Sequence, residues 1–91
     1  MAMDRLQAMR LYTRIVELGS FTAAAGDLDL PRATVTHAIK RLEARLGAQL
    51  LLRTTRRVQA TRDGETYYRH CVRLLADVDE VESDFREARV Q

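Results

Sequence analysis

The sequence predicts a mainly α-helical fold of four helices and one short β-hairpin. Apolar residues recur at the spacing of an α-helix in four segments, whereas residues 49–61 alternate as strands do. Glycine follows two of the helical segments, where it favours the left-handed conformation that ends a helix. A chain of 91 residues is long enough for one domain with a modest hydrophobic core.

The first two helices are predicted from their apolar spacing and their ends. Residues 4–18 carry an apolar stripe at helical spacing, and Gly19 follows directly. Ser20 or Thr22 can cap a second, short helix over residues 23–28, because a hydroxyl oxygen there accepts a bond from a free backbone N–H. The small residues of this second helix allow close packing.

The third helix begins at Pro31, after a tight turn at residues 29–30. Proline is favoured in a first helical turn because its missing N–H would have no partner there. Gly47 ends the helix. One apolar stripe faces the predicted core, and it consists of Val35, Ile39, Leu42 and Leu46.

The segment QLLLRTTRRVQAT predicts two short strands around a polar turn at Thr54-Thr55-Arg56, which form a wing with a basic tip. The turn lacks glycine, so its type is not predicted. Thr61 can then cap a last helix of about 26 residues, roughly 39 Å long. This helix is longer than a domain of this size needs for its own core.

Positive charge is concentrated in the middle of the chain. Residues 31–62 carry eight arginine or lysine residues against Glu43 alone, so this segment has a net charge of +7, between a net −1 before it and −4 after it. Such clustering favours a polyanionic partner, although a solvated basic face would give the same charge pattern. Seven of the eight are arginine, which suits forked recognition of phosphates and guanine edges.

The exposed face of the third helix is predicted to be small near its start and cationic further along. Ala33 and the threonines suit close approach to base edges, and Lys40 and Arg41 suit phosphates. Two helices joined by a short turn, the second with such a face, form a helix–turn–helix. The predicted fold is therefore a winged helix–turn–helix, of three helices plus a two-stranded β wing, followed by a long dimerisation (linker) helix.

The last helix carries a heptad seam that predicts self-association. Its alternative is an amphipathic helix folded onto its own core, for which Tyr68, Val72 and Leu75 offer a second apolar edge. The seam, which we expect to form a dimer interface, consists of Tyr67, Cys71, Leu74, Val78, Val81, Phe85 and Ala88.

Catalytic and metal-binding patterns are missing from the sequence. His70 and Cys71 are adjacent, so on a helix they point about 100° apart and do not form a metal pair. No phosphate loop, paired-cysteine or dinucleotide motif is present, so no enzyme, metal or cofactor is expected. The single cysteine excludes an intrachain disulfide, and no secretory signal or membrane span is seen. We therefore expect a cytoplasmic protein.

Several motifs together carry a family resemblance. The stretch GSFTAAAGDLDLPRATVTHAIKRLEARLGAQLLLRTTRRVQATRDGE contains GSFT, V-T-x-x-I-x-x-LE-x-x-LG, L-x-R-x-x-R and T-x-x-G. With these motifs the chain resembles the N-terminal winged helix–turn–helix of bacterial LysR-type transcriptional regulators, from about Met3 to Phe85. The resemblance implies a homodimer joined through the linker helices and bound to double-stranded DNA at an interrupted dyad operator. The third helix would enter the major groove and the wing the minor groove.

Residue roles follow from the same resemblance. It implies that residues 1–61 form the DNA-binding domain and residues 62–91 the linker. Residues expected to face bases are Arg32, Ala33, Thr36 and His37, with Arg56 in the minor groove. Residues expected to hold phosphates are Thr22, Thr34, Lys40, Arg41, Arg53 and Arg57.

The chain departs from the family pattern in the base-reading surface and in its length. Pro31, Arg32 and Ala33 stand where serine, glutamine and proline are usual, His37 replaces an arginine, and Leu51 replaces a phenylalanine of the wing. Family members continue into a C-terminal effector-binding domain. We therefore expect a DNA-binding fragment, whose small-molecule inducer would act only through that domain. The alternative is a winged-helix module that binds protein and does not read DNA.

Overall fold

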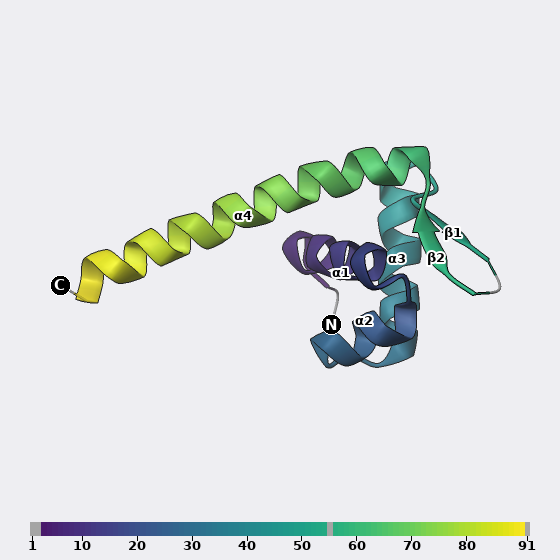
Figure 1. Ribbon diagram of the computed structural model, residues 1–91, viewed down its shortest axis with the longest axis horizontal. Helices are drawn as coiled ribbons and strands as arrows, with labels where there is room; N and C mark the ends of the chain where they lie inside the picture. The colour runs from purple at the N-terminus through teal and green to yellow at the C-terminus, as the bar shows by residue number, and fades with distance from the viewer. Residues whose placement is uncertain (1–2, 55, 91) are drawn as a thin grey trace.

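The structure, a computed structural model, describes residues 3–54 and 56–90, with the side chain of Val90 left out (Figure 1). Thr55, which the sequence places in the wing turn, lies outside the described residues. The predicted fold class is confirmed. In chain order the elements are α1 (Arg5–Leu18), α2 (Phe21–Leu28), α3 (Arg32–Leu46), β1 (Leu51–Arg53), β2 (Val58–Ala60) and α4 (Arg62–Val90).

The ends of the helices agree with the sequence expectations in most details. The Ser20 side chain accepts a hydrogen bond from the backbone N–H of Ala23, which settles the cap of α2 and moves its start forward to Phe21. Gly19 and Gly47 both have positive φ, at 67° and 68°, and end α1 and α3. Pro31 is the residue before α3 and not its first helical residue, and it gives no side-chain cap.

The wing is an antiparallel hairpin with the register Leu51↔Ala60, Leu52↔Gln59 and Arg53↔Val58. Leu51 is buried and Leu52 is half exposed, because successive side chains of a strand point to opposite faces. The backbone N–H of Val58 donates to the carbonyl oxygen of Gly19 over 3.1 Å. This bond ties β2 to the corner between α1 and α2.

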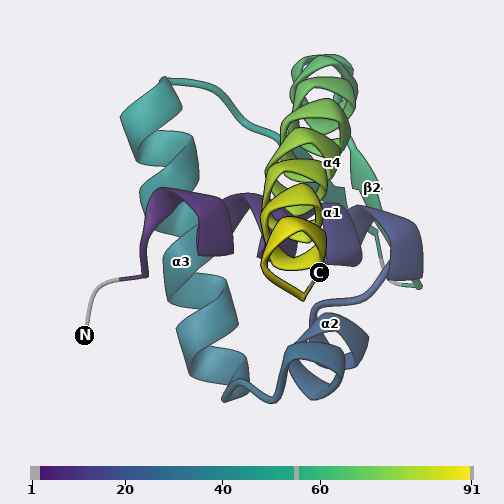
Figure 2. The same ribbon diagram turned by 90° about the vertical axis from the view of Figure 1, so that its left-hand side faces the viewer.

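Helix α1 lies at the centre of the fold and contacts α2, α3 and α4. Figure 2 shows it crossing behind α4 and beside α3. Because neighbours pack on several sides, α1 buries a wide sector and not a single narrow stripe. The fully buried side chains of this core include Leu11, Tyr12 and Ile15 of α1 with Val35 and Leu42 of α3.

The junction between the wing and α4 centres on the carbonyl oxygen of Leu50. That oxygen accepts a bond from the Tyr12 hydroxyl over 2.9 Å and another from the backbone N–H of Thr61 over 3.0 Å. Thr61 caps α4 as predicted, since its hydroxyl oxygen accepts from the N–H of Gly64 over 2.9 Å. The first turn of α4 is therefore fixed directly against α1 and the start of the wing.

Glu43 has a structural role that the sequence does not suggest. One of its carboxylate oxygens accepts bonds from the backbone N–H groups of Leu50, over 2.7 Å, and of Leu51, over 3.3 Å. Glu43 thus contributes to the fold as well as to the charge of residues 31–62. The carboxylate of Glu43 holds the end of α3 to the beginning of the wing through these two hydrogen bonds.

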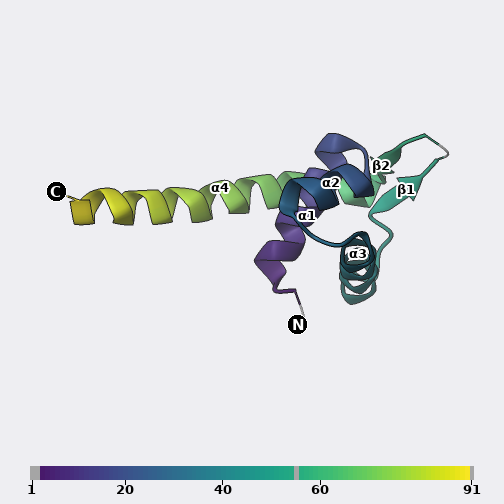
Figure 3. The ribbon, with the colours of Figure 1, turned by 90° about the horizontal axis from the view of Figure 1, so that it is seen from below.

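Helix α4 divides into a packed first half and a projecting second half. Cys71 is fully buried and Leu75 nearly so, and the Tyr67 ring meets the Tyr12 ring edge-on with centroids 5.3 Å apart. Asp79 of α4 pairs with Arg10 of α1 over 3.2 Å. Past this ion pair, α4 extends away from the other elements (Figure 3). The molecule is 52 Å long as a result.

We expect the protein to lose stability above pH 10, because the buried Tyr12 and the half-buried Tyr67 meet at the α1–α4 contact. Burial raises the pKa of Tyr12 above its ordinary value of 10.0 and raises the pKa of Tyr67 to about 12. The unfolded chain releases these protons first, so this stability is complete below pH 10 and falls as the pH rises towards 12. Urea unfolding between pH 8 and pH 11 measures the effect. Tyr67→Phe should flatten the alkaline fall, and an unchanged slope would show that Tyr67 does not contribute.

Candidate nucleic-acid interface

The polar face of α3 is exposed on the side away from the core. Ala33, His37, Lys40 and Arg41 are exposed, and Thr36 is half-buried. The buried stripe ends earlier along α3 than predicted, since Leu46 is 45% exposed. The helix thus offers a small, hydrogen-bonding start and a cationic middle, as the sequence predicts.

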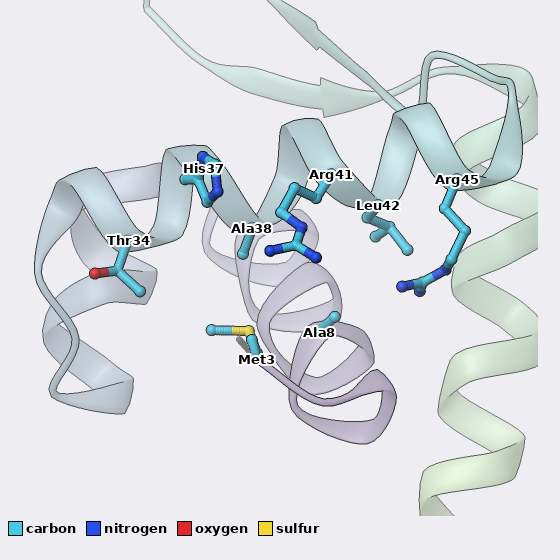
Figure 4. Close-up of a pocket in the computed structure, with 8 residues that line it drawn as sticks. All are labelled: Met3, Ala8, Thr34, His37, Ala38, Arg41, Leu42 and Arg45. Atoms are coloured by element: carbon cyan, nitrogen blue, oxygen red, sulfur yellow. The ribbon is translucent and has the colours of Figure 1, made fainter. Parts of the chain in front are cut away.

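One hollow, of about 230 Å³, follows α3 on the side of α1. Figure 4 shows Thr34, His37, Arg41 and Arg45 along one side of α3, over Met3 and Ala8. Sequence reasoning placed Thr34, His37 and Arg41 at the interface but missed Arg45. Its position four residues after Arg41 is the signal that would have found it.

A second hollow, of about 430 Å³, lies between α3 and β1. Thr36 and Lys40 reach it from the helix and Arg53 from the wing. Glu43 also lines it, but its carboxylate is engaged by the backbone of the wing. Each of these two hollows therefore contains residues predicted to contact bases together with residues predicted to contact phosphates, and the hollows lie on different sides of α3.

A third hollow, of about 230 Å³, lies where α2, α3 and the wing meet. It brings together residues from three separate parts of the sequence that were assigned to DNA, and these are Thr22, Arg32, Arg53, Arg56 and Arg57. Phe21 also lines it, although the sequence analysis assigned no role to this residue.

The arginines of this surface lack acidic partners in the part of the chain that the structure describes. There, the three ion pairs all involve Arg10 or Arg14 of α1, and none includes an arginine of α3 or the wing. A cluster of cations without carboxylates is costly for a folded chain unless an anion or water offsets the repulsion. The arrangement therefore suits a polyanion.

The predicted dimer residues divide into two groups. Tyr67 and Cys71 face α1 of their own chain, and a fully buried Cys71 has no surface to offer a second copy. The expectation for these two residues does not fit their packing. Leu74, Val81 and Phe85 are 50%, 68% and 63% exposed, Val78 is half-buried, and Ala88 is exposed.

None of the helices in the described ranges is long and apolar enough to cross a membrane.

A family model and two related proteins are all described as helix-turn-helix regulators. The model of a family described as "Bacterial regulatory helix-turn-helix protein, lysR family" matches residues 6–65. An HTH-type transcriptional repressor of Pseudomonas aeruginosa (strain UCBPP-PA14) is 45% identical over 84 residues, which are 92% of this chain and 26% of that protein. The HTH-type transcriptional activator AaeR of Escherichia coli (strain K12) is 39% identical over 79 residues, 87% of this chain and 26% of AaeR. The chain thus spans about a quarter of the length of these relatives.

Solved structures resemble the whole fold. The crystal structure of a BenM DBD/catB site 1 DNA complex superposes with a TM-score of 0.88 at 34% identity, over 92% of this chain and 93% of that one. A CbnR DBD–DNA complex gives a TM-score of 0.85 at 26% identity, over 93% of this chain and 98% of that one. Both similarities include the wing and most of α4.

Proposed function

The chain belongs to the lysR family of bacterial regulatory helix-turn-helix proteins, and we propose that it binds double-stranded DNA sequence-specifically as the DNA-binding part of a dimeric cytoplasmic transcriptional regulator. The observation that carries this proposal is the polar and cationic lining of three hollows, two along α3 and one where α2, α3 and the wing meet. Its arginines have no carboxylate partners within the described residues. Similarity to two DNA complexes supports it.

The proposed docking places α3 in the major groove and the wing in an adjacent minor groove. A major groove admits one α-helix, and the small start of α3 at Ala33 lets the backbone approach base edges. His37, Thr36 and Ala33 are proposed to contact bases. Lys40 and Arg41, further along α3, are proposed to contact phosphates as the helix leaves the groove.

Binding to DNA should weaken steeply as salt is added, because each phosphate contact releases counterions. Lys40→Ala should weaken binding to every duplex sequence and reduce the slope of log affinity against log salt by about 0.9 for each protomer bound. His37→Ala should instead cost about 1–3 kcal/mol per half-site and relax the preference at one base pair of each half-site.

Fluorescence anisotropy over a salt series, on a site selected from a random duplex library, measures both effects. Arg86→Ala removes the same charge from an exposed position on α4 and serves as the control. Affinity that does not change with salt would contradict the phosphate contacts. No duplex binding even at low salt would favour the alternative of a protein-interaction module.

A further inference from the structure

The hollow between α2, α3 and the wing is lined by four arginines, Arg32, Arg53, Arg56 and Arg57, and by no carboxylate of the residues that the structure describes. Two of them, Arg32 of α3 and Arg53 of β1, are 21 residues apart in the chain but meet at the same aromatic ring. The other two lie at the tip of the wing and complete the positive lining.

The shared ring is that of Phe21, the first residue of α2. The guanidinium carbon of Arg32 lies 4.8 Å from the ring centroid and that of Arg53 lies 4.2 Å from it. Guanidinium groups at such distances are attracted by the electron-rich ring face. Phe21 is only 3% exposed and belongs to the hydrophobic core, so the ring is a fixed platform for both cations.

Arg32 is held by further contacts within the chain. Its Nε donates to the hydroxyl oxygen of Thr22 over 3.3 Å, and one of its terminal nitrogens donates to the hydroxyl oxygen of Thr36. Bidentate reading of a guanine requires an arginine that extends freely into the groove and presents one edge to the base. Arg32 is instead held between α2 and α3, and it lines the same hollow as Arg53.

Two guanidinium groups that share one ring repel each other unless an anion lies between them. Both guanidinium groups lie close to one ring centroid, at 4.8 Å and 4.2 Å, and both line the hollow, so a phosphate group that enters it can be reached from either side chain. Charge-assisted bonds from guanidinium to phosphate oxygen have nitrogen–oxygen distances of about 2.7–2.9 Å.

We propose that this hollow binds a single phosphate group of the DNA backbone between Arg32 and Arg53, and that Phe21 is the positioning residue that holds the two arginines in place. Arg32 is thereby removed from the base-reading set. Because α3 and the wing would bind the same phosphate, one contact fixes the register of both elements on the duplex. The proposal rests on the proposed binding to DNA.

The first experiment compares Arg32→Ala with the unmodified protein on the preferred site and on unrelated duplexes. We expect, for each protomer bound, a loss of roughly tenfold on every sequence and a salt slope reduced by about 0.9. Loss confined to one base position, with an unchanged salt slope, would overturn this proposal and return Arg32 to base reading while leaving DNA binding intact. Failure of the unmodified protein to bind any duplex would overturn the proposed function as well.

A double-substitution cycle tests whether the two arginines share one phosphate. Arg32→Ala combined with Arg53→Ala should weaken binding by less than the product of the two single effects, since the second change removes a contact that the first has already impaired. Multiplicative effects would show two separate phosphates and overturn the shared site. Arg86→Ala combined with Arg32→Ala gives the matched control, for which multiplication is expected.

The positioning role of Phe21 needs a readout besides folding. Phe21→Leu keeps an apolar side chain but removes the ring, so it should lower affinity on all sequences and reduce the salt slope. Thr22→Val removes the acceptor for Arg32 at an exposed position and should cause the same kind of loss, more weakly, without affecting the core. If Thr22→Val and a folded Phe21→Leu both keep the full salt slope, the arginines do not depend on these residues and the positioning role is wrong.

Discussion

Replacing Gly64 with alanine is expected to be the most damaging single change to the fold. An added Cβ would lie 2.0 Å from the carbonyl oxygen of Leu50 and 2.4 Å from the hydroxyl oxygen of Tyr12. Neither atom can move easily, because the two are hydrogen-bonded to each other over 2.9 Å and Tyr12 is fully buried. The start of α4 would have to shift away from α1 and the wing.

The free energy of unfolding should fall by at least about 3 kcal/mol, in the upper range for overpacking. This loss occurs although alanine is the better helix former by about 1 kcal/mol. Urea unfolding followed by circular dichroism measures the change.

Gly26→Ala is the matched control for this prediction. Gly26 lies inside α2, and a Cβ added there meets no atom within 4 Å. Its replacement should leave stability unchanged or raise it by up to about 1 kcal/mol. If the two alanine variants are equally stable, the close approach at Gly64 does not restrict this position.

The helix boundaries could be predicted because their signals are local. A glycine in the left-handed region and a serine that bonds three residues ahead act within one turn, so Gly19, Gly47 and Ser20 mark their ends without reference to the rest of the fold. Asp29 shows the limit of such signals. It ends α2 at φ 56°, in the left-handed region that glycine usually occupies, so its sequence gives only a weak signal for a helix end.

The sidedness of α4 could not be predicted because it depends on where that helix crosses α1. The heptad pattern identifies Cys71 and Val81 as equivalent positions on one seam. Only the fold shows that Cys71 lies over α1 whereas Val81 lies past its end. Periodicity gives the direction of an apolar face but not what covers it.

The sequence predicted which charged residues belong to the candidate interface, but only part of their arrangement in space. The clustering of arginine in residues 31–62 indicated a polyanion, and helical spacing placed Lys40 and His37 on the outer face of α3. The convergence of Arg32 and Arg53 on Phe21 joins α2, α3 and the wing. Such a contact depends on tertiary packing, which no local pattern encodes.

The double variant Val81→Glu with Phe85→Glu is expected to convert the protein from a dimer to a monomer. Both side chains lie on the projecting half of α4, at 68% and 63% exposure, where the described chain offers them no core. Burying each side chain against a second copy would contribute about 1.5–3 kcal/mol per protomer. In the double variant, dimerisation would bury two unpaired carboxylates on each protomer. The free-energy cost of burying them disfavours the dimer.

Loss of the dimer should weaken binding to a two-half-site operator by about 10²- to 10⁴-fold, because the second half-site contact no longer forms within one complex. Binding to a single half-site should be unchanged, since neither residue lies near α3 or the wing. The fold of residues 5–75 should also persist. Sedimentation velocity measures the oligomeric state, and anisotropy on one-site and two-site duplexes measures the affinities.

Ala76→Glu adds one carboxylate to an exposed position of α4 that lies off the apolar seam, so it should remain a dimer. It separates the effect of added charge from the effect of charge at the interface. A double variant that still sediments as a dimer would place the interface elsewhere, and the exposed Leu6 and Leu18 of α1 would be the next residues to change. A monomer with undiminished affinity for the two-half-site operator would show that dimerisation through α4 does not drive DNA binding.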